Sequence, residues 1–108
     1  LDLGNNQLTA LPESLGELKD LIELNLDDNE LTTLPERLFS DGNLPKLEEL
    51  DVSRNMLTTL PRNLNNLKQL QFLHISGNPF TPEIAQDPQA YVDGLFSERR
   101  EEERVNVS

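Results

Sequence analysis

Residues 21–31 read LIELNLDDNEL, and this arrangement of leucines returns along the whole first part of the chain. It reappears as LEELDVSRNML at residues 47–57 and as LQFLHISGNPF at residues 70–80. The chain opens on LDLGNNQL, which is the same unit without its first three residues. The shared pattern, L-x-x-L-x-L-x-x-N-x-L, follows neither the period of a helix nor that of a long strand. A unit repeated every 23 to 26 residues predicts a stack of similar coils.

The second half of each unit repeats as well and contains a Leu-Pro pair. It reads LTALPESLGELKD from residue 8, LTTLPERLFSDGNLPKL from residue 31 and LTTLPRNLNNLKQL from residue 57. We assign the three extra residues of the middle unit to Ser40, Asp41 and Gly42. Over residues 1 to about 80, the chain resembles the leucine-rich repeat family, in its short class of 23-residue units that end in L-P-x-x-L-x-x-L.

The uneven leucines have a physical explanation in a stack of coils. Leu24 and Leu26 alternate, so this short segment is predicted to form a strand with both leucines on one face. One coil cannot bury its leucines alone, but stacked coils share one core and place their strands in a parallel sheet. The resemblance implies an α/β solenoid, with a short curved sheet on the concave face and irregular, 3₁₀ or short helical returns on the convex face.

An asparagine occupies the same place in each unit, directly after the predicted strand. The backbone turns there while still buried, so its amide and carbonyl groups need partners. An asparagine side chain offers both donors and an acceptor, and a stacked column can serve successive turns. The predicted structural column consists of Asn6, Asn29, Asn55 and Asn78. Asn5 and Asn66 lie outside the pattern, and we expect them on the surface.

The repeats are assigned to residues 1–80, with the first one truncated, and residues 81–108 to a C-terminal capping helix and tail. Asp87 is a good helix N-cap, and Pro88 suits the first helical position. The apolar face of the helix consists of Tyr91, Val92, Leu95 and Phe96. The helix is predicted within residues 87–104, fraying at the glutamates that crowd its end. The helix either caps the core, binds a partner or begins a second domain. The sequence does not decide whether residues 105–108 form a further strand.

Composition narrows the classes of partner. The chain has 108 residues and a formal charge of −11, which argues against nucleic acid and anionic membranes as partners. No cysteine is present, so we expect a reducing compartment such as the cytoplasm, or a cysteine-free exported bacterial protein. Because the first unit is incomplete, we expect further chain before residue 1.

The strand residues between the buried leucines form an exposed lattice. Its predicted columns contain Asp2, Asn25, Asp51 and His74, then Gly4, Asp27, Ser53 and Ser76, then Glu23, Glu49 and Phe72. Five of these residues are carboxylates, and none is Lys or Arg. The lattice is either a solvated face or a docking surface for a basic protein or peptide, with an apolar anchor at Phe72. The candidate partner-binding residues are Asp2, Glu23, Asn25, Asp27, Glu49, Asp51, Ser53, Phe72 and His74.

Catalysis is not favoured by the sequence. His74, Ser76 and Asp51 could be joined as a triad, but the first two lie two residues apart on one strand, roughly 6.5–7 Å between Cα atoms, on a face open to water. A metal site from Asp51, His74 and Asn25 lacks the sequence clustering of dedicated sites. We therefore predict no enzymatic activity, no cofactor and no metal in this segment.

Two classes of function remain. The resemblance implies a protein–protein interaction module. The alternative is a recognition segment of a larger multidomain enzyme, because relatives of this repeat class precede kinase, GTPase or ubiquitin-ligase domains. The first strand, with Leu1 and Leu3, is predicted to expose an open edge and an apolar side, so we expect either self-association through this end or fraying of residues 1–8.

Overall fold

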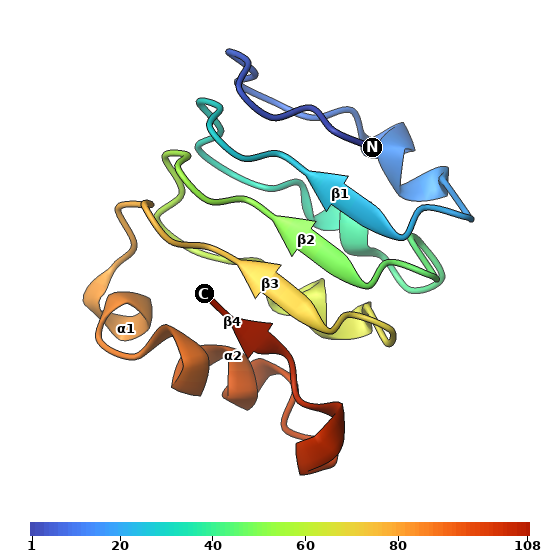
Figure 1. The fold of residues 1–108 in the computed structure, drawn as a ribbon, viewed down its shortest axis with the longest axis vertical. Coiled ribbons are helices and arrows are strands. Elements are labelled where there is room, and N and C mark those ends of the chain that lie inside the picture. Colours follow the sequence, from blue (N-terminus) through green and yellow to red (C-terminus); the bar gives the residue numbers. More distant parts are fainter.

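The computed structural model describes residues 1–108 and places four parallel strands side by side in one sheet (Figure 1). They are β1 (Glu23–Asn25), β2 (Glu49–Asp51), β3 (Phe72–His74) and β4 (Asn106–Val107). Their order in the sheet is their order in the chain, so each coil lies next to the one before it. The predicted solenoid with a parallel sheet is confirmed.

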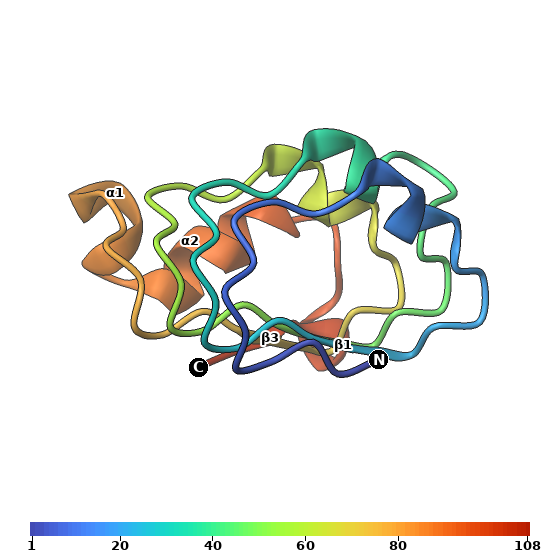
Figure 2. The ribbon, with the colours of Figure 1, turned by 90° about the horizontal axis from the view of Figure 1, so that it is seen from above.

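The returns between the strands lie on the opposite side of the molecule, as the view along the stack shows (Figure 2). They contain three 3₁₀ helices, η1 (Glu13–Glu17), η2 (Glu36–Phe39) and η3 (Arg62–Asn66). Each helix starts directly after a Leu-Pro pair, and the N-cap prolines have φ of −70°, −65° and −68°. Proline holds φ near this value and lacks the amide hydrogen that a helix start leaves unpaired. The predicted 3₁₀ returns are confirmed.

Leucines from the strands and the returns meet between the two layers in a single core. Leu24, Leu50 and Leu73 are adjacent in the sheet register and are at most 1% exposed. Leu26 and Val52, two residues after their strand leucines, are 0% exposed. The period-two alternation therefore puts both apolar residues of each strand segment inside, as predicted.

The longer middle unit accommodates its extra residues in a loop after η2. Gly42 has φ of +87°, a left-handed conformation that glycine adopts without a Cβ clash. The loop then packs on the first coil, where the backbone amide of Leu44 donates to the carbonyl of Gly16 at 3.0 Å. A Cβ on Gly16 would approach the Leu38 carbonyl oxygen within 2.8 Å, so this contact requires glycine. The insertion thereby leaves the register of β1 and β2 unbroken.

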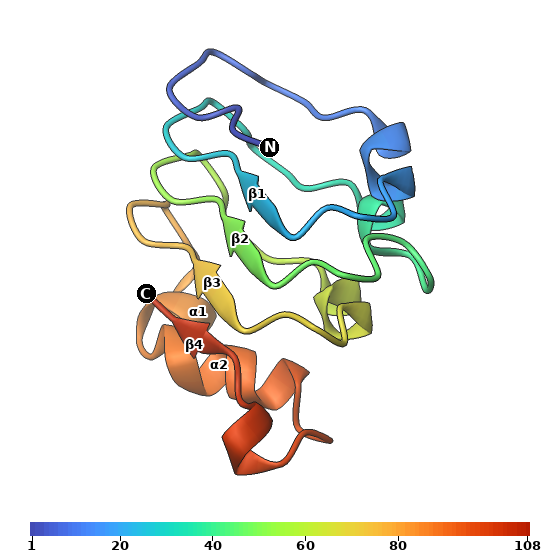
Figure 3. The same cartoon turned by 45° about the vertical axis from the view of Figure 1, so that its right-hand side comes forward.

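Two helices close the β3–β4 end of the stack (Figure 3). They are α1 (Pro82–Ala85) and α2 (Pro88–Leu95), and the second begins at the predicted N-cap. The carboxylate of Asp87 accepts a hydrogen bond from the amide of Ala90 at 3.1 Å. Val92 and Phe96 are buried in the core, which confirms the capping helix.

Helix α2 ends at Leu95, inside the predicted range and before the glutamates at which the helix was expected to fray. Glu101–Glu103 form a separate 3₁₀ helix, η4, instead of a frayed last turn. The tertiary structure redirects the chain, because Nη1 of Arg99 donates to the carbonyl of Leu70 at 2.5 Å and ties the segment to the third coil. None of the helices has the length and apolar character needed to cross a membrane.

The last residues form the further strand that the sequence left open. Asn106 and Val107 pair in parallel with Phe72 and Leu73. The backbone amide of Ile75 donates to the carbonyl of Ser108 at 2.7 Å, which extends the pairing. The repeat pattern stops near residue 80, but the sheet continues beyond it.

Candidate interaction surface

The exposed side of the sheet presents polar residues in rows across the strands. The register places Glu23, Glu49 and Phe72 in one row. Asn25, Asp51 and His74 form the next row. Asp2 joins this row through an isolated parallel β-bridge to Asn25. Two of the three columns expected from the repeat are therefore in register across the sheet. Strand β4 extends the first row by Asn106, which lies next to Phe72.

Asp2, Asn25 and Asp51 share one local arrangement that the sequence analysis did not anticipate. Oδ1 of each accepts a hydrogen bond from the backbone amide two residues later, at 2.9 Å in all three cases. Such a bond mimics a backbone turn and starts the bend after each strand. The signal for it was the Asp or Asn type at the same place in three units. These candidate binding residues thus have a structural role in the turns.

Arg54 corrects the expectation of a face without basic side chains. It lies in the turn after β2, yet its Nε donates to Oδ1 of Asp27 at 2.9 Å and its Nη2 contacts Oδ2. The hydrogen bond from Arg54 lowers the pKa of Asp27 below its ordinary value. The carboxylate in turn raises the pKa of Arg54, so both groups are charged at neutral pH. One of the five carboxylates is therefore neutralised by a neighbour.

His74 contacts the carboxylate of Glu49 and the hydroxyl of Ser108. Asp51 is its neighbour in the register, but Nε2 of His74 lies 3.2 Å from Oε2 of Glu49. Nδ1 of His74 lies 2.5 Å from Oγ of Ser108. The side chain of Asp51 is turned to Ser53, where it accepts from the backbone amide and contacts the hydroxyl. The triad of His74, Ser76 and Asp51 does not assemble.

Phe72 remains 41% exposed on this surface, although it is a large apolar residue. Its neighbours in the row are Glu49 on one side and Asn106 on the other. Glu23 is two strands away, roughly 10 Å at the usual strand spacing. Phe72 is therefore an exposed aromatic ring with polar neighbours in its row.

The asparagine column links each coil to the one before it. Nδ2 of Asn55 donates to the carbonyls of Leu26 and Val52, both at 3.0 Å, and Oδ1 accepts from the amide of Leu31 at 3.1 Å. Asn29 and Asn78 make the equivalent bonds in their coils. Each of these side chains therefore satisfies its own turn and the turn of the preceding coil.

Asn6 forms only half of this arrangement. Its Nδ2 donates to the carbonyls of Leu3 and Gly4 at 2.8 Å and 3.1 Å, within its own turn. The side chain is exposed, unlike the buried Asn29 and Asn55. The four asparagines that the pattern treats as equivalent are therefore not equivalent in the structure.

The residue before each column asparagine has a left-handed backbone, a feature that the sequence analysis missed. The φ angles are 59° at Asn5, 59° at Asp28, 53° at Arg54 and 75° at Gly77. Asn, Asp and Gly tolerate this region well, so their types were a usable signal. Arginine tolerates it less readily, and at this position the side chain of Arg54 reaches Asp27.

Asn66 also differs from its expected surface role. It is half-buried, and its Nδ2 donates to the carbonyl of Phe39 at 2.9 Å. Asn63 makes a similar bond to the carbonyl of Glu36 at 2.6 Å. Asparagines on the convex side thus connect η3 to η2, as the column asparagines connect the turns. No group of three or more His, Asp or Glu side chains is arranged to hold a metal.

The coils, the asparagine column and the parallel sheet define a leucine-rich repeat protein. A family model described as leucine rich repeat matches residues 24–80, and a second leucine-rich repeat model matches residues 1–18. The chain belongs to the leucine-rich repeat family.

Solved structures and curated sequences give two further findings. The leucine-rich repeat protein LIC12759 of Leptospira interrogans is 31% identical, with a TM-score of 0.79. The match covers 98% of this chain and 24% of that one, so this chain spans about a quarter of its length. No match was found among curated proteins.

Proposed function

We propose that this chain is a protein-interaction module that docks a basic protein or peptide on the exposed face of its sheet. Membership of the family supports a protein-binding role in general. The observation that carries the docking face is Phe72, which stays 41% exposed between polar neighbours on an open sheet. A buried partner side chain over this ring gains apolar contact that neither protein has alone.

The carboxylates of the exposed sheet face that have no basic neighbour determine which kind of partner fits. Asp2, Glu23 and Asp51 have no basic side chain within 4.0 Å, whereas Asp27 is paired with Arg54. Glu49 lies beside His74, which neutralises it only when the imidazole is protonated. With the imidazole of His74 neutral, the face keeps a net negative charge. A partner with Lys or Arg next to an apolar residue complements it.

The experiment is affinity capture with the whole chain and with Phe72→Ala as matched baits. Proteins from an extract of the source organism are compared between the two baits at about 0.15 M salt, where the Debye length is about 8 Å. We expect a basic protein enriched on the wild-type bait and lost on Phe72→Ala. Equal capture by both baits would show that the partner does not use this face.

The alternative proposal is a recognition segment within a larger multidomain enzyme, such as a kinase, GTPase or ubiquitin ligase. The coverage of only 24% of the Leptospira interrogans chain is consistent with a segment of a longer protein. The full open reading frame distinguishes the two, because a catalytic domain beside the repeats favours the alternative.

We also propose self-association through the first coil. Leu1 and Leu18 are 50% and 42% exposed, whereas Leu24 and Leu44, which hold the same places in the second coil, are each 1% exposed. The second coil is covered by the first, and the same apolar surface of the first coil is open. A second copy that covers these leucines removes them from water.

A further inference from the structure

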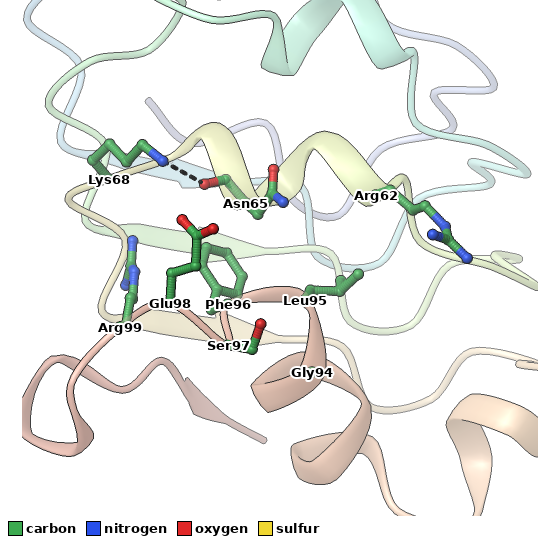
Figure 4. A pocket seen from close by; sticks show the side chains of 9 residues that line it. All are labelled: Arg62, Asn65, Lys68, Gly94, Leu95, Phe96, Ser97, Glu98 and Arg99. Carbon is green, nitrogen blue, oxygen red and sulfur yellow. Dashed lines mark hydrogen bonds between the residues drawn. The ribbon is translucent and has the colours of Figure 1, made fainter.

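A groove on the convex side lies between η3 and the segment that follows α2. Its volume is about 420 Å³, and Arg62, Asn65 and Lys68 line it from the η3 side. Residues 94–99 line the other side. Figure 4 shows Arg62 at one end of the groove and Lys68 with Arg99 at the other, with Asn65 between them. The groove is separate from the exposed face of the sheet.

The basic residues that lack an acidic partner gather at this groove. Five of the nine pair with a carboxylate within 4.0 Å: Arg37, Lys46, Arg54, Arg100 and Arg104. The remaining four are Lys19 and the three that line the groove. In a protein with 20 acidic side chains, three uncompensated cations in one groove form a local site of opposite sign.

Arg99 holds one side of the groove in place. Its guanidinium donates to the backbone carbonyls of Leu67 and Leu70 and lies 4.5 Å from the centre of the Phe96 ring. A cation fixed in this way contributes charge without having to be ordered by the ligand. Three of its donors are used, because Nη1 also donates to the carbonyl of Glu103. The side chains left to bind an anion are Arg62 and Lys68, and Nζ of Lys68 makes one bond of its own, at 3.4 Å to the carbonyl of Asn65.

Glu98 is the only carboxylate in the lining. It forms no ion pair within 4.0 Å, and Figure 4 shows it pointing into the groove between Phe96 and Asn65. An anion that enters the groove therefore meets the positive charges of Arg62, Lys68 and Arg99 and one repulsive carboxylate. This arrangement predicts that neutralising Lys68 lowers the affinity for an anion and that neutralising Glu98 raises it.

We propose that this groove binds an acidic segment of a protein partner, with Arg62 and Lys68 pairing with its carboxylates. A short acidic segment fits because two free cations match a few carboxylates, whereas a long polyanion would lie against the protein's own acidic surface. At about 0.15 M salt, charges beyond about 8 Å are largely screened, so the groove acts through its nearest side chains. This site is distinct from the proposed basic-partner face and could serve a second partner.

The test is a titration of the whole chain with a fluorescein-labelled hexaglutamate peptide, followed by anisotropy and by amide NMR shifts. We expect saturable binding, with shifted amides in residues 62–68 and 94–99. Lys68→Gln should weaken binding about two- to fivefold, as for an exposed ion pair, and Glu98→Gln should strengthen it by a similar factor. Hexaglutamine is the uncharged control peptide.

Lys19→Gln is the matched control variant, because Lys19 is the one other basic residue without a carboxylate partner and lies in the first coil. It should leave the affinity unchanged. The proposal is overturned if hexaglutamate does not bind even to Glu98→Gln, or if Lys19→Gln weakens binding as much as Lys68→Gln. Shifts confined to residues outside the groove would overturn it as well.

Discussion

Arg54 binds the carboxylate of Asp27, which lies on the preceding coil and 27 residues earlier in the chain. Nε of Arg54 lies 2.9 Å from Oδ1 of Asp27, and Nη2 contacts the second oxygen, so both carboxylate oxygens are engaged. The pair connects the turns of two successive coils at the rim of the sheet. The side chain of Arg54 is 65% exposed, so solvent screens the pair and its contribution to stability is small. Its larger effect is on the charge of the exposed sheet face, where we propose that a partner docks.

The first prediction concerns the titration of Asp27. Arg54→Gln should raise the pKa of Asp27 toward the ordinary value of about 3.9, because the hydrogen bond from Arg54 is the main cause of its lowering. Carboxyl-carbon NMR over the acid range measures this directly. Lys46→Gln is the control and should leave Asp27 unchanged, since Lys46 pairs with Asp20.

The same pair gives a sign for the pH dependence of stability. The pKa of Asp27 is lower in the folded chain than in the unfolded chain, so its contribution is present above the unfolded pKa. The contribution is lost as pH falls through the lower folded-state pKa. Urea unfolding of wild type and Arg54→Gln at several pH values should differ near neutral pH and converge in strong acid. If the difference in stability between wild type and Arg54→Gln grew on acidification, Asp27 would not be stabilised in its charged form by Arg54.

The second prediction concerns the core. Leu50 is 0% exposed in the central strand pair, and Leu50→Ala should reduce the free energy of unfolding by about 2–5 kcal/mol through lost burial and a cavity. Leu18→Ala is the control and should cost clearly less, because Leu18 is 42% exposed. Urea unfolding followed by circular dichroism measures both. Equal losses for the two variants would mean that the assignment of inside and outside is wrong.

The third prediction concerns the asparagine column. Asn55→Ala leaves the carbonyls of two coils and one amide without partners and should cost about 1–3 kcal/mol. Asn6→Ala should cost less, because the bonds of Asn6 lie within one exposed turn. Asn65→Ala, on the exposed side of η3, should be near neutral. A greater loss of thermal stability for Asn6→Ala than for Asn55→Ala would contradict the structural role of the asparagine column.

The fourth prediction concerns the open first coil. If Leu1 and Leu18 mediate self-association, Leu18→Lys should shift sedimentation velocity toward the monomer at high protein concentration. Met56→Lys is the matched control, because Met56 is 53% exposed but lies in a turn outside the first coil. A wild-type chain that stays monomeric at all concentrations would remove self-association as a proposal.

The fifth prediction concerns a captured basic partner. Phe72→Ala should speed dissociation at every salt concentration by about fivefold or more, the effect of losing an anchor worth over 1 kcal/mol. Glu23→Lys should instead slow association and flatten its dependence on salt, because it reverses a steering charge. Surface plasmon resonance separates the two rates.

The control for this binding test is charge reversal on the convex side. Glu13→Lys changes the net charge by the same amount as Glu23→Lys but lies at the start of η1, away from the sheet face. It should alter the association rate less than Glu23→Lys. If the two variants changed the association rate equally, the convex side would become the candidate binding surface.

The sequence alone determined the coil, the strand register and most of the core. Leucines spaced two apart can be buried together only on one face of a strand, and an asparagine among them can satisfy a buried turn. These are local constraints that recur in every unit, so one unit predicts the next. Leu50 and Asn55 illustrate them, since both are buried where the pattern places them.

Tertiary structure decided which partners the longer side chains contact and how the chain continues after the leucine repeats end. Arg54 neutralises Asp27 because a left-handed turn brings the side chain of Arg54 onto the preceding coil. The spacing of the leucines does not predict this contact. Helix α2 ends at Leu95, and Arg99 fixes the following segment on carbonyls of the third coil. A flexible side chain can choose among partners in several coils, so its contact depends on the packed arrangement rather than on the local sequence.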